Sequence, residues 1–343
     1  MNILELKDSD NDRWNRFVEH NHAGSIYHLH EWRELIYKLF GHKSYYLYAE
    51  SDAGDVTGIL PIIRLKSRLF GDYMVSMPYV NYGGAIGNSR TTEHSLMDYA
   101  SKLGEKLGVQ HIEFRDIYER QQTWPIRTDK VAMILDLPEE EETLWTSLGS
   151  KMRAQIKRPL RENPHVKHGH IELLDDFYSV FSTNMRDLGT PVYPKIFFKT
   201  ILETFPENCH LVIIHLNNRP VCAGFLISYK KTIEIPWASS LREVNPFGMN
   251  MLLYWEVIKY AIQQGFSHFD FGRSTIDSGT HRFKKQWGAQ MKQLYWHYWL
   301  SDGQEIPQLS PGNAKYKFAI AAWKKMPVFM TTLIGPGIVK NLP

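Results

Sequence analysis

The sequence predicts two tandem α/β domains, each built on a mixed sheet, and two observations favour this fold class. The chain has 343 residues, which suits two domains because one domain is typically about 150 residues long. Two segments also share one series of elements: a meander of strands, an amphipathic helix and a buried strand. A repeated series of this kind is typical of a duplicated mixed-sheet unit.

Apolar periodicity places these elements along the chain. The first half is expected to contain strands at 44–51, 56–67 and 111–116, and a helix at 94–108. The second half repeats them with strands at 209–216, 221–229, 232–240 and 269–274, and a helix at 250–265. Amphipathic helical segments precede the two meanders, at 12–39 and 175–205. We therefore expect two domains of the same plan.

The predicted domain boundaries follow from this repeat. The first domain covers 1–140, the second covers 141–300 and carries the chemistry, and 301–343 form a C-terminal tail. The tail mixes apolar residues with Trp323 and two lysines. Two interpretations of it stay open: the tail packs on the protein, or it lies on a membrane surface.

Charge and cysteine content narrow the functional classes. The net charge of +3 is too small for the whole surface to bind a polyanion, so an anionic partner must meet a local patch. Cys209 and Cys222 offer no disulfide framework, and His28 and His30 lack further ligands, so no metal site is predicted. The charged N-terminus indicates a cytoplasmic protein, with the inner face of the membrane as an alternative place.

Five strings, in this order, resemble the FemAB-like acyltransferases of the GNAT superfamily. They are SKMRAQIKR (150–158), MRDLGTPVYPK (185–195), ASSLREVNPFGMNMLLYWEVIKYA (238–261), FDFGRS (269–274) and RFKKQWG (282–288). That group is related to the aminoacyltransferases that build peptidoglycan cross-bridges, and the strings are most similar to its exosortase- and exopolysaccharide-associated subgroup. The resemblance implies two tandem GNAT-like domains and an acyl-transfer reaction.

Two departures from the family leave the acyl donor open. The long helical-hairpin arm of the cross-bridge enzymes has no counterpart, since no extended heptad segment interrupts the second half. The GNAT pyrophosphate loop, Arg or Gln followed by x-x-G-x-G/A, is missing from both meanders. We expect no tightly bound cofactor, and the donor is either aminoacyl-tRNA or acyl-CoA.

Three residues are predicted to be catalytic. Acyl transfer to an amine needs fixed donors or cations that stabilise the tetrahedral oxyanion. The resemblance implies this role for Lys284, because it aligns with the lysine of the family's F-K-x-x-[WF]-G string. Arg273 is expected to clamp a carboxylate or phosphate, or else to pair with an aspartate. Asp270 is expected to orient one of these groups, or to satisfy a backbone donor.

Seven further residues are predicted to bind substrate, each with a structural alternative. Arg153 and Lys157 share a helix face in a basic stretch that suits phosphates or a solvated surface. Arg186 and Tyr193 lie on a Gly/Pro-containing loop that either covers a pocket or simply connects two elements. The remaining three are Trp237 and Trp287, which either stack on ligand or fill the core, and Asn250, a substrate contact or a helix N-cap.

The sequence thus predicts an N-acyltransferase that moves an aminoacyl or acyl group onto an amine of a cell-envelope, peptidoglycan or exopolysaccharide precursor. Its expected partners are a nucleotide- or lipid-linked sugar precursor, transfer RNA if the donor is aminoacyl-tRNA, and a peripheral membrane contact. Two alternatives stay open: an acetyl-CoA-dependent GNAT N-acetyltransferase, and a non-catalytic module that binds polysaccharide intermediates.

Overall fold

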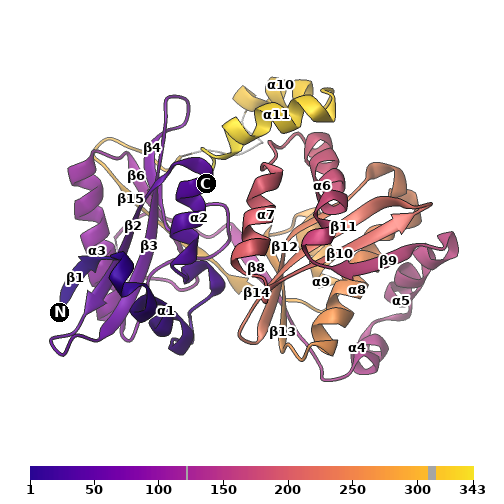
Figure 1. Cartoon of the computed structure of the whole chain (residues 1–343), viewed down its shortest axis with the longest axis horizontal. Coiled ribbons are helices and arrows are strands. Elements are labelled where there is room, and N and C mark those ends of the chain that lie inside the picture. The colour runs from indigo at the N-terminus through magenta and orange to yellow at the C-terminus, as the bar shows by residue number, and fades with distance from the viewer. Residues whose placement is uncertain (121–122, 308–313) are drawn as a thin grey trace. The chain divides into compact units, whose positions relative to one another are not determined.

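A computed structural model describes residues 1–120, 123–307 and 314–343 of the chain. It divides into two compact units (Figure 1). Unit 1 contains Met1–Val131 with the described parts of Gln293–Gln308 and Lys340–Pro343. Unit 2 contains Ala132–Lys292 and the described part of Leu309–Val339.

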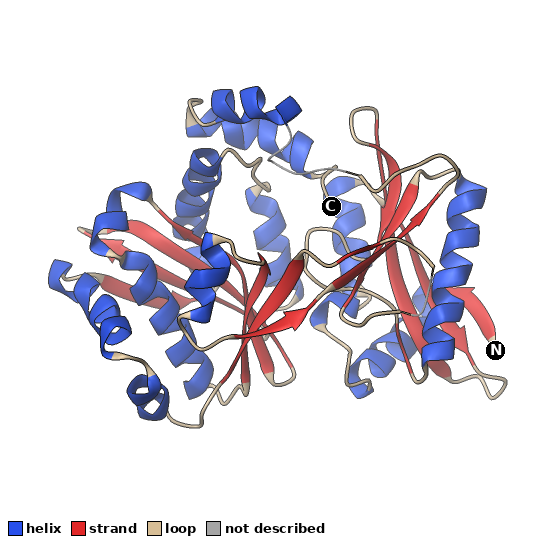
Figure 2. Cartoon of the chain, turned by 180° about the vertical axis from the view of Figure 1, so that it is seen from behind, coloured by secondary structure: helices blue, strands red, loops and turns tan. Residues whose placement is uncertain are grey.

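Unit 1 is a twisted mixed sheet covered by helices on both faces, as Figure 2 shows by secondary structure. Its strands are β1 (Asn2–Glu5), β2 (Lys43–Glu50), β3 (Val56–Ser67), β4 (Gly71–Val75), β5 (Ile86–Gly87), β6 (His111–Asp116), β7 (Ile126–Arg127) and β15 (Tyr295–Leu300). They follow the order β1-β2-β3-β4-β6-β15-β7, with β5 beside β3. The helices are α1 (Asn11–His20), α2 (Glu31–Phe40) and α3 (Arg90–Leu107). A core cluster forms where α3 packs against β2, β3 and β6.

Unit 2 repeats this arrangement. Its strands are β8 (Lys130–Asp136), β9 (His165–Gly169), β10 (Cys209–Leu216), β11 (Arg219–Tyr229), β12 (Thr232–Ser240), β13 (His268–Thr275) and β14 (Gln290–Gln293), in the order β14-β8-β13-β12-β11-β10-β9. The helices are α4 (Glu141–Ser147), α5 (Ser150–Lys157), α6 (Leu174–Leu188), α7 (Lys195–Thr204), α8 (Met249–Gln263), α9 (Gly279–Lys285), α10 (Ala314–Trp323) and α11 (Val328–Val339). Helices α6 and α8 both pack on β10, β11 and β12.

The two sheets share one topology, and this confirms the predicted fold class. In unit 1, an antiparallel meander β2-β3-β4 leads through α3 to β6, which pairs in parallel with β4. In unit 2, the meander β10-β11-β12 leads through α8 to β13, which pairs in parallel with β12. Strands β3, β6, β10 and β12 have the bounds that apolar periodicity and turn residues predict.

The observed units differ from the predicted domain boundaries because the chain exchanges strands between them. Strand β8 joins the sheet of unit 2, whereas β15 returns to the sheet of unit 1 and pairs with β6. Every residue of β6 is buried, so this strand needs a partner along both of its edges. Segment 295–300, expected in the second domain, supplies that second partner. Of the predicted tail, 308–313 lie outside the described residues.

Both amphipathic segments that precede the meanders consist of two helices. Segment 12–39 forms α1 and α2, with a short 3-10 turn between them. Segment 175–205 forms α6 and α7, because Gly189 ends α6 in the left-handed conformation and Pro194 precedes α7. The 3-10 turns are η1 (Asp8–Asp10), η2 (Ile26–His28), η3 (Arg158–Glu162), η4 (Ile171–Leu173) and η5 (Arg242–Phe247).

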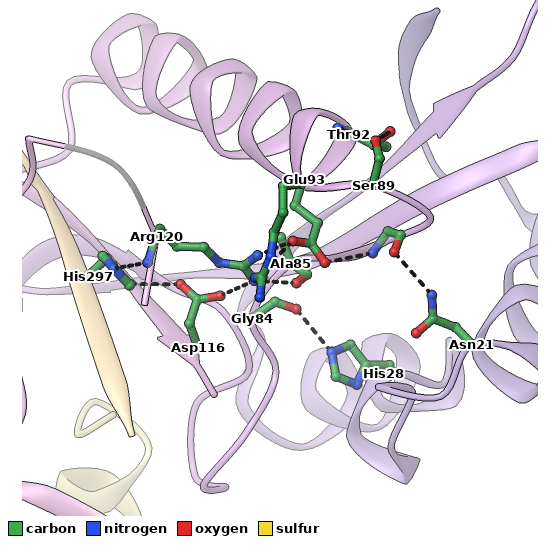
Figure 3. Close-up of polar contacts among 12 residues, drawn as sticks. Asn21, His28, Gly84, Ala85, Ser89, Thr92, Glu93, Asp116, Arg120 and His297 are labelled. Carbon is green, nitrogen blue, oxygen red and sulfur yellow. Dashed lines mark hydrogen bonds and ion pairs between the residues drawn. The ribbon is translucent and has the colours of Figure 1, made fainter. Parts of the chain in front are cut away.

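Buried ion pairs hold β15 in unit 1 (Figure 3). The Arg120 guanidinium pairs with the carboxylates of Glu93 and Asp116, and it lies 2.8 Å from Asp116 Oδ1. His297, on β15, places Nδ1 3.0 Å from Asp116 Oδ2 and accepts the backbone N–H of Arg120 at Nε2 over 3.1 Å. Since Nε2 is an acceptor, Nδ1 carries the proton that His297 donates to Asp116. The network fixes a strand that is distant in sequence to β6 and α3.

The protonation state of Asp116 couples this network to pH. Burial alone would raise the pKa of the Asp116 carboxyl, but the charge of Arg120 and the hydrogen bond that His297 donates hold it below its ordinary value. A carboxylate whose pKa is lowered in the folded state stabilises that state above its unfolded pKa, and the stabilisation is lost as pH falls. The network therefore supports unit 1 at neutral pH and weakens in acid.

We predict unequal losses of stability when two arginines that pair with Glu93 are replaced. Arg120→Met leaves buried carboxylates without their cation and should lower the free energy of unfolding by about 3–5 kcal/mol. Arg90→Met removes a pair on a side chain that is 55% exposed and should cost less than about 1 kcal/mol. Urea denaturation at pH 7 measures both, and equal losses would contradict the structural role of the network.

Candidate functional site

The candidate site lies in unit 2, where the parallel ladder between β12 and β13 ends. These strands pair from Thr232 with His268 to Glu234 with Asp270. Beyond that point β12 has a bulge, since its pairing with β11 shifts between Phe225 and Ile227. Both strands continue past the last pair, to Ser240 and Thr275. Two carboxylates therefore sit side by side at the end of the ladder.

A lysine from α9 reaches the backbone at this position. Lys284 Nζ donates hydrogen bonds to the carbonyl oxygens of Gly272 and Arg273, over 3.1 and 2.9 Å. The backbone N–H of Gly272 donates to Asp270 Oδ1 over 2.7 Å. Gly272 has a φ of 72°, a conformation that favours glycine. Asp270 and Lys284 thus bind the backbone of the same residue: Asp270 accepts from the N–H of Gly272, and Lys284 donates to its carbonyl.

We call Glu234, Asp270 and Lys284 the buried charged cluster. All three side chains are buried, and Lys284 is only 7% exposed. Burial lowers the pKa of the Lys284 ammonium to about 8; the carboxylates of Asp270 and Glu234 oppose this effect, and the charge of Arg273 adds to it. The ammonium is therefore charged at neutral pH and lies close to its titration point.

The two predicted catalytic cations differ in their exposure to solvent. Lys284 is buried, whereas the Arg273 side chain is exposed. The two residues are in contact because Lys284 donates a hydrogen bond to the backbone carbonyl of Arg273. Asp270 takes the expected alternative of satisfying a backbone donor, at Gly272, and its charge also favours the protonated Lys284. The site thus has a buried ammonium, and the residue whose backbone carbonyl it binds has an exposed guanidinium.

Two polar groups close to Asp270 and Lys284 in the sequence are buried with no hydrogen-bond partner among the described residues. They are the Ser274 hydroxyl oxygen and the Trp287 indole nitrogen, Nε1. An unsatisfied buried polar group costs about 1–3 kcal/mol, so each is a candidate for contact with a ligand. The Trp287 ring also packs near Tyr254 and Phe283, as expected if it fills the core.

Two residues of this region were not predicted from sequence, although signals for them exist. Glu234 is the one acid inside the apolar strand TIEIPWASS, and it faces Asp270 across the ladder. Ser274 lies between exposed Arg273 and Thr275, so its side chain turns inward. A lone charge within an apolar strand is costly unless it is paired, and this rule would have identified Glu234.

The basic stretch at 150–167 has a structural component. Arg153 Nη1 donates to the carbonyl of Leu148 over 2.7 Å and to that of Thr146 over 3.2 Å, which satisfies the C-terminal end of α4. The Lys157 ammonium lies 5.3 Å from the ring centre of Trp145. The other basic side chains of the stretch are exposed and keep phosphate binding as their predicted role: Lys151, Arg158, Arg161 and Lys167.

Arg186 lies in the last turn of α6 and not on the predicted loop, whereas Tyr193 lies in the connection between α6 and α7. The C-terminal helices of unit 2 contact Arg186 and, in this connection, Val192. Arg186 pairs with Asp187 at 2.6 Å and donates to the Met326 carbonyl over 2.9 Å. The Tyr193 ring stacks on Phe197, with the ring centres 4.8 Å apart. These contacts favour the connecting role that the sequence left open for this loop.

Trp237 and Asn250 also take structural positions. The Trp237 ring is buried among aromatic side chains, with ring centres 5.1 Å from Phe198 and 5.3 Å from Phe225. It fills the core, its expected alternative. Asn250 is half-buried in the first turn of α8, whose N-cap is Gly248, so its N-cap alternative is wrong.

Comparison with known protein families finds a match within the second unit. Residues 150–285 match the family described as an acetyltransferase (GNAT) domain. This segment contains β12, β13 and the buried charged cluster. No curated protein matches the sequence.

Solved structures with the same fold cover nearly the whole chain. FemX has a TM-score of 0.64 at 15% identity, over 86% of this chain and 97% of its own. A C-terminal domain from Agrobacterium fabrum, named for lysylphosphatidylglycerol synthetase, has a TM-score of 0.57 at 11% identity, over 95% and 96%. A tandem GNAT protein of the clavulanic acid pathway has a TM-score of 0.52 at 10% identity, over 89% and 99%.

These identities are low, so the likeness is one of fold. The match at 150–285 confirms the predicted GNAT resemblance in the second unit, and the fold of FemX extends over both units, as the FemAB-like resemblance predicts. They also confirm the expected class of enzyme, an acyltransferase.

We predict that the neighbouring lysines of α9 differ sharply in their contribution to stability. Lys284→Met removes the buried ammonium whose charge the Asp270 and Glu234 carboxylates favour, and it should lower the free energy of unfolding by about 3 kcal/mol. Lys285→Met is the matched control on an exposed side chain and should change it by less than about 0.5 kcal/mol. Denaturant unfolding of both variants measures the difference; a Lys284 variant as stable as the control would show that the cluster is not a structural unit.

Proposed function

We propose that this chain, whose residues 150–285 form a GNAT domain, is an N-acyltransferase in which Lys284 stabilises the acyl carbonyl under attack. It would transfer an aminoacyl or other acyl group to an amine of a cell-envelope, peptidoglycan or exopolysaccharide precursor. The observation that carries the proposal is the Lys284 ammonium, buried where the β12–β13 ladder ends. Two of its three protons are donated to the carbonyls of Gly272 and Arg273.

The reaction needs no covalent enzyme intermediate. The acceptor nitrogen attacks the acyl carbon, the new C–N bond forms, and the bond from that carbon to the donor oxygen or sulfur breaks. The amine loses a proton and the leaving group gains one, so atoms and charge balance. The third N–H of Lys284 would donate a hydrogen bond to the oxyanion of the tetrahedral intermediate, and the lysine would keep its proton. Because Lys284 is buried, water would compete little for this hydrogen bond.

The remaining cations suit an anionic substrate. Arg273 lies exposed next to the carbonyl that Lys284 binds, and its planar guanidinium suits a phosphate or carboxylate. Among the predicted substrate-binding residues, Trp287 has a buried indole N–H without a partner among the described residues. These groups support a nucleotide- or lipid-linked sugar as acceptor.

The donor and acceptor classes rest on resemblance as well as geometry. The five FemAB-like strings support an aminoacyl donor and a cell-envelope or exopolysaccharide acceptor, and one structure of the same fold is named for lysylphosphatidylglycerol synthetase. The absence of the GNAT pyrophosphate loop from the sequence argues against acetyl-CoA. We therefore favour aminoacyl-tRNA as donor, with the exposed basic side chains of the 150–167 stretch as its contact.

Mass spectrometry of envelope and polysaccharide precursors tests the proposal directly. A strain lacking this protein should accumulate a precursor that lacks one acyl or aminoacyl mass. Complementation with Lys285→Ala should restore that mass, whereas Lys284→Ala and Arg273→Ala should not. If both latter variants restore the mass while Arg158→Glu does not, the chain is a non-catalytic binding module.

Calorimetry distinguishes the two donors. Charged transfer RNA should bind the full chain, and Arg158→Ala with Arg161→Ala should weaken this binding and reduce its dependence on salt concentration. Acetyl-CoA should give no binding heat. Saturable binding of acetyl-CoA, unaffected by these two replacements, would favour the N-acetyltransferase alternative.

We predict a specific pH dependence for the donor–acceptor pair found in this way. Because the pKa of Lys284 is about 8, its stabilising charge is present below that pH and is lost above it. The kcat of the wild type should therefore fall as pH rises through about 8. Lys285→Ala should keep this alkaline limb, and Lys284→Ala should show a low rate without it. A rate that rises through this range only in proteins with Lys284 would make the lysine a general base instead.

A further inference from the structure

Helices α10 and α11 pack on unit 2 through small residues. The buried positions of α11 are Thr331, Gly335 and Val339, which recur every four residues on one face. A Cβ atom at Gly335 would lie 2.9 Å from the backbone nitrogen of Val192, so this close approach requires glycine. Figure 1 shows the two helices over the end of α6. The inner face of α11 is therefore buried against unit 2.

The outer face of α11 is apolar and exposed. Phe329 is 71% exposed and Leu333 80% exposed, one helical turn apart, and Met330 and Ile334 form a second exposed row beside them. On α10, Phe318 is 86% exposed. A helix on the surface of a globular protein normally turns its apolar side chains inward. Here the larger apolar side chains point away from unit 2.

The segment that carries these side chains has charged residues of one sign. The sequence from 306 to 343 contains five lysines and neither aspartate nor glutamate. Of these lysines, Lys317, Lys324 and Lys325 are exposed on or next to α10. Exposed apolar side chains together with basic ones complement a surface that is apolar inside and anionic outside, which describes a bilayer with anionic lipids.

We propose that the outer face of α10 and α11 docks the protein on the surface of an anionic lipid bilayer. Phe318, Phe329 and Leu333 enter the boundary between headgroups and acyl chains, and the lysines contact lipid phosphates. The helices lie in the plane of the surface, because the 12 residues of α11 extend about 18 Å. Over the part of the chain that the structure describes, no helix has the length and hydropathy to cross a membrane.

This surface is distinct from the buried charged cluster and does not depend on acyl transfer. A second copy of the chain is the main competing occupant. Its apolar contacts would bring two sets of lysines together without an acid between 306 and 343 to offset them. The charge of the segment therefore favours anionic lipid over self-association.

Sedimentation of the full chain with vesicles tests the proposal. The wild type should bind vesicles of phosphatidylcholine with about one-third phosphatidylglycerol at least about tenfold more tightly than pure phosphatidylcholine, and more weakly at high salt. Phe329→Gln with Leu333→Gln should weaken binding to the anionic vesicles about tenfold or more. Leu69→Gln, on a side chain 79% exposed in unit 1, is the matched control and should leave binding unchanged.

Charge reversal supplies an independent arm. Lys324→Glu with Lys325→Glu should remove the preference for anionic vesicles, whereas Lys102→Glu with Lys106→Glu, on exposed positions of α3, should retain it. A wild type that does not bind anionic vesicles would overturn the proposal, whatever the variants do. Sedimentation equilibrium without lipid would also overturn it if the wild type is a dimer that Phe329→Gln with Leu333→Gln dissociates.

Discussion

The buried ammonium of Lys284 is the interaction on which the end of the β12–β13 ladder depends. It connects the short helix α9 to β13 through two backbone carbonyls, and it offsets the charges of Glu234 and Asp270. Without a cation at this position, two adjacent buried carboxylates would be strongly unfavourable. The same contacts that hold the strand end in place fix the position of the cation to which we assign the stabilisation of the acyl carbonyl.

The closeness of Lys284 to its titration point links structure to function. Burial lowers its pKa while two carboxylates raise it, so modest changes in nearby charge shift its protonation. A negative charge that develops on a substrate carbonyl would favour the protonated lysine. An ordinary surface lysine, fully charged and solvated, would respond far less to the same event.

The two units have one topology but differ in the polar side chains at the end of the strand that pairs in parallel, β6 in unit 1 and β13 in unit 2. In unit 1, the charges on β6 pair within the protein: Arg115 with Glu113 at 2.8 Å, and Asp116 with Arg120 and His297. In unit 2, the corresponding end has the Lys284 ammonium and the Ser274 hydroxyl, for which no hydrogen-bond partner occurs among the residues that the structure describes. The proposed chemistry is placed in unit 2 because this unit contains the segment that matches a GNAT domain.

Local patterns in the sequence predict the elements of this fold well, whereas contacts between distant segments are beyond them. Strands β10 and β12 have the expected bounds because their apolar runs end at turn residues. The return of β15 to unit 1 depends on its pairing with β6, across about 180 residues, for which no local signal exists. The same reason applies to the α10–α11 helices, whose contacts with Arg186 and Val192 only the folded chain reveals.

The site shows the same division. The F-K-x-x-[WF]-G resemblance identifies Lys284, but neither its burial nor its contact with the Arg273 carbonyl follows from spacing. Trp237 illustrates the opposite case, since aromatic residue type alone does not distinguish a core ring from a ligand platform.

An NMR titration of lysine side chains, labelled with 13C at Cε and assigned with Lys284→Arg, tests whether Lys284 is a buried ammonium. One lysine signal, absent from this variant, should titrate near a pKa of about 8. A Lys284 signal that titrates with the other lysines, near the ordinary value of about 10.4, would show a solvated ammonium and contradict the account.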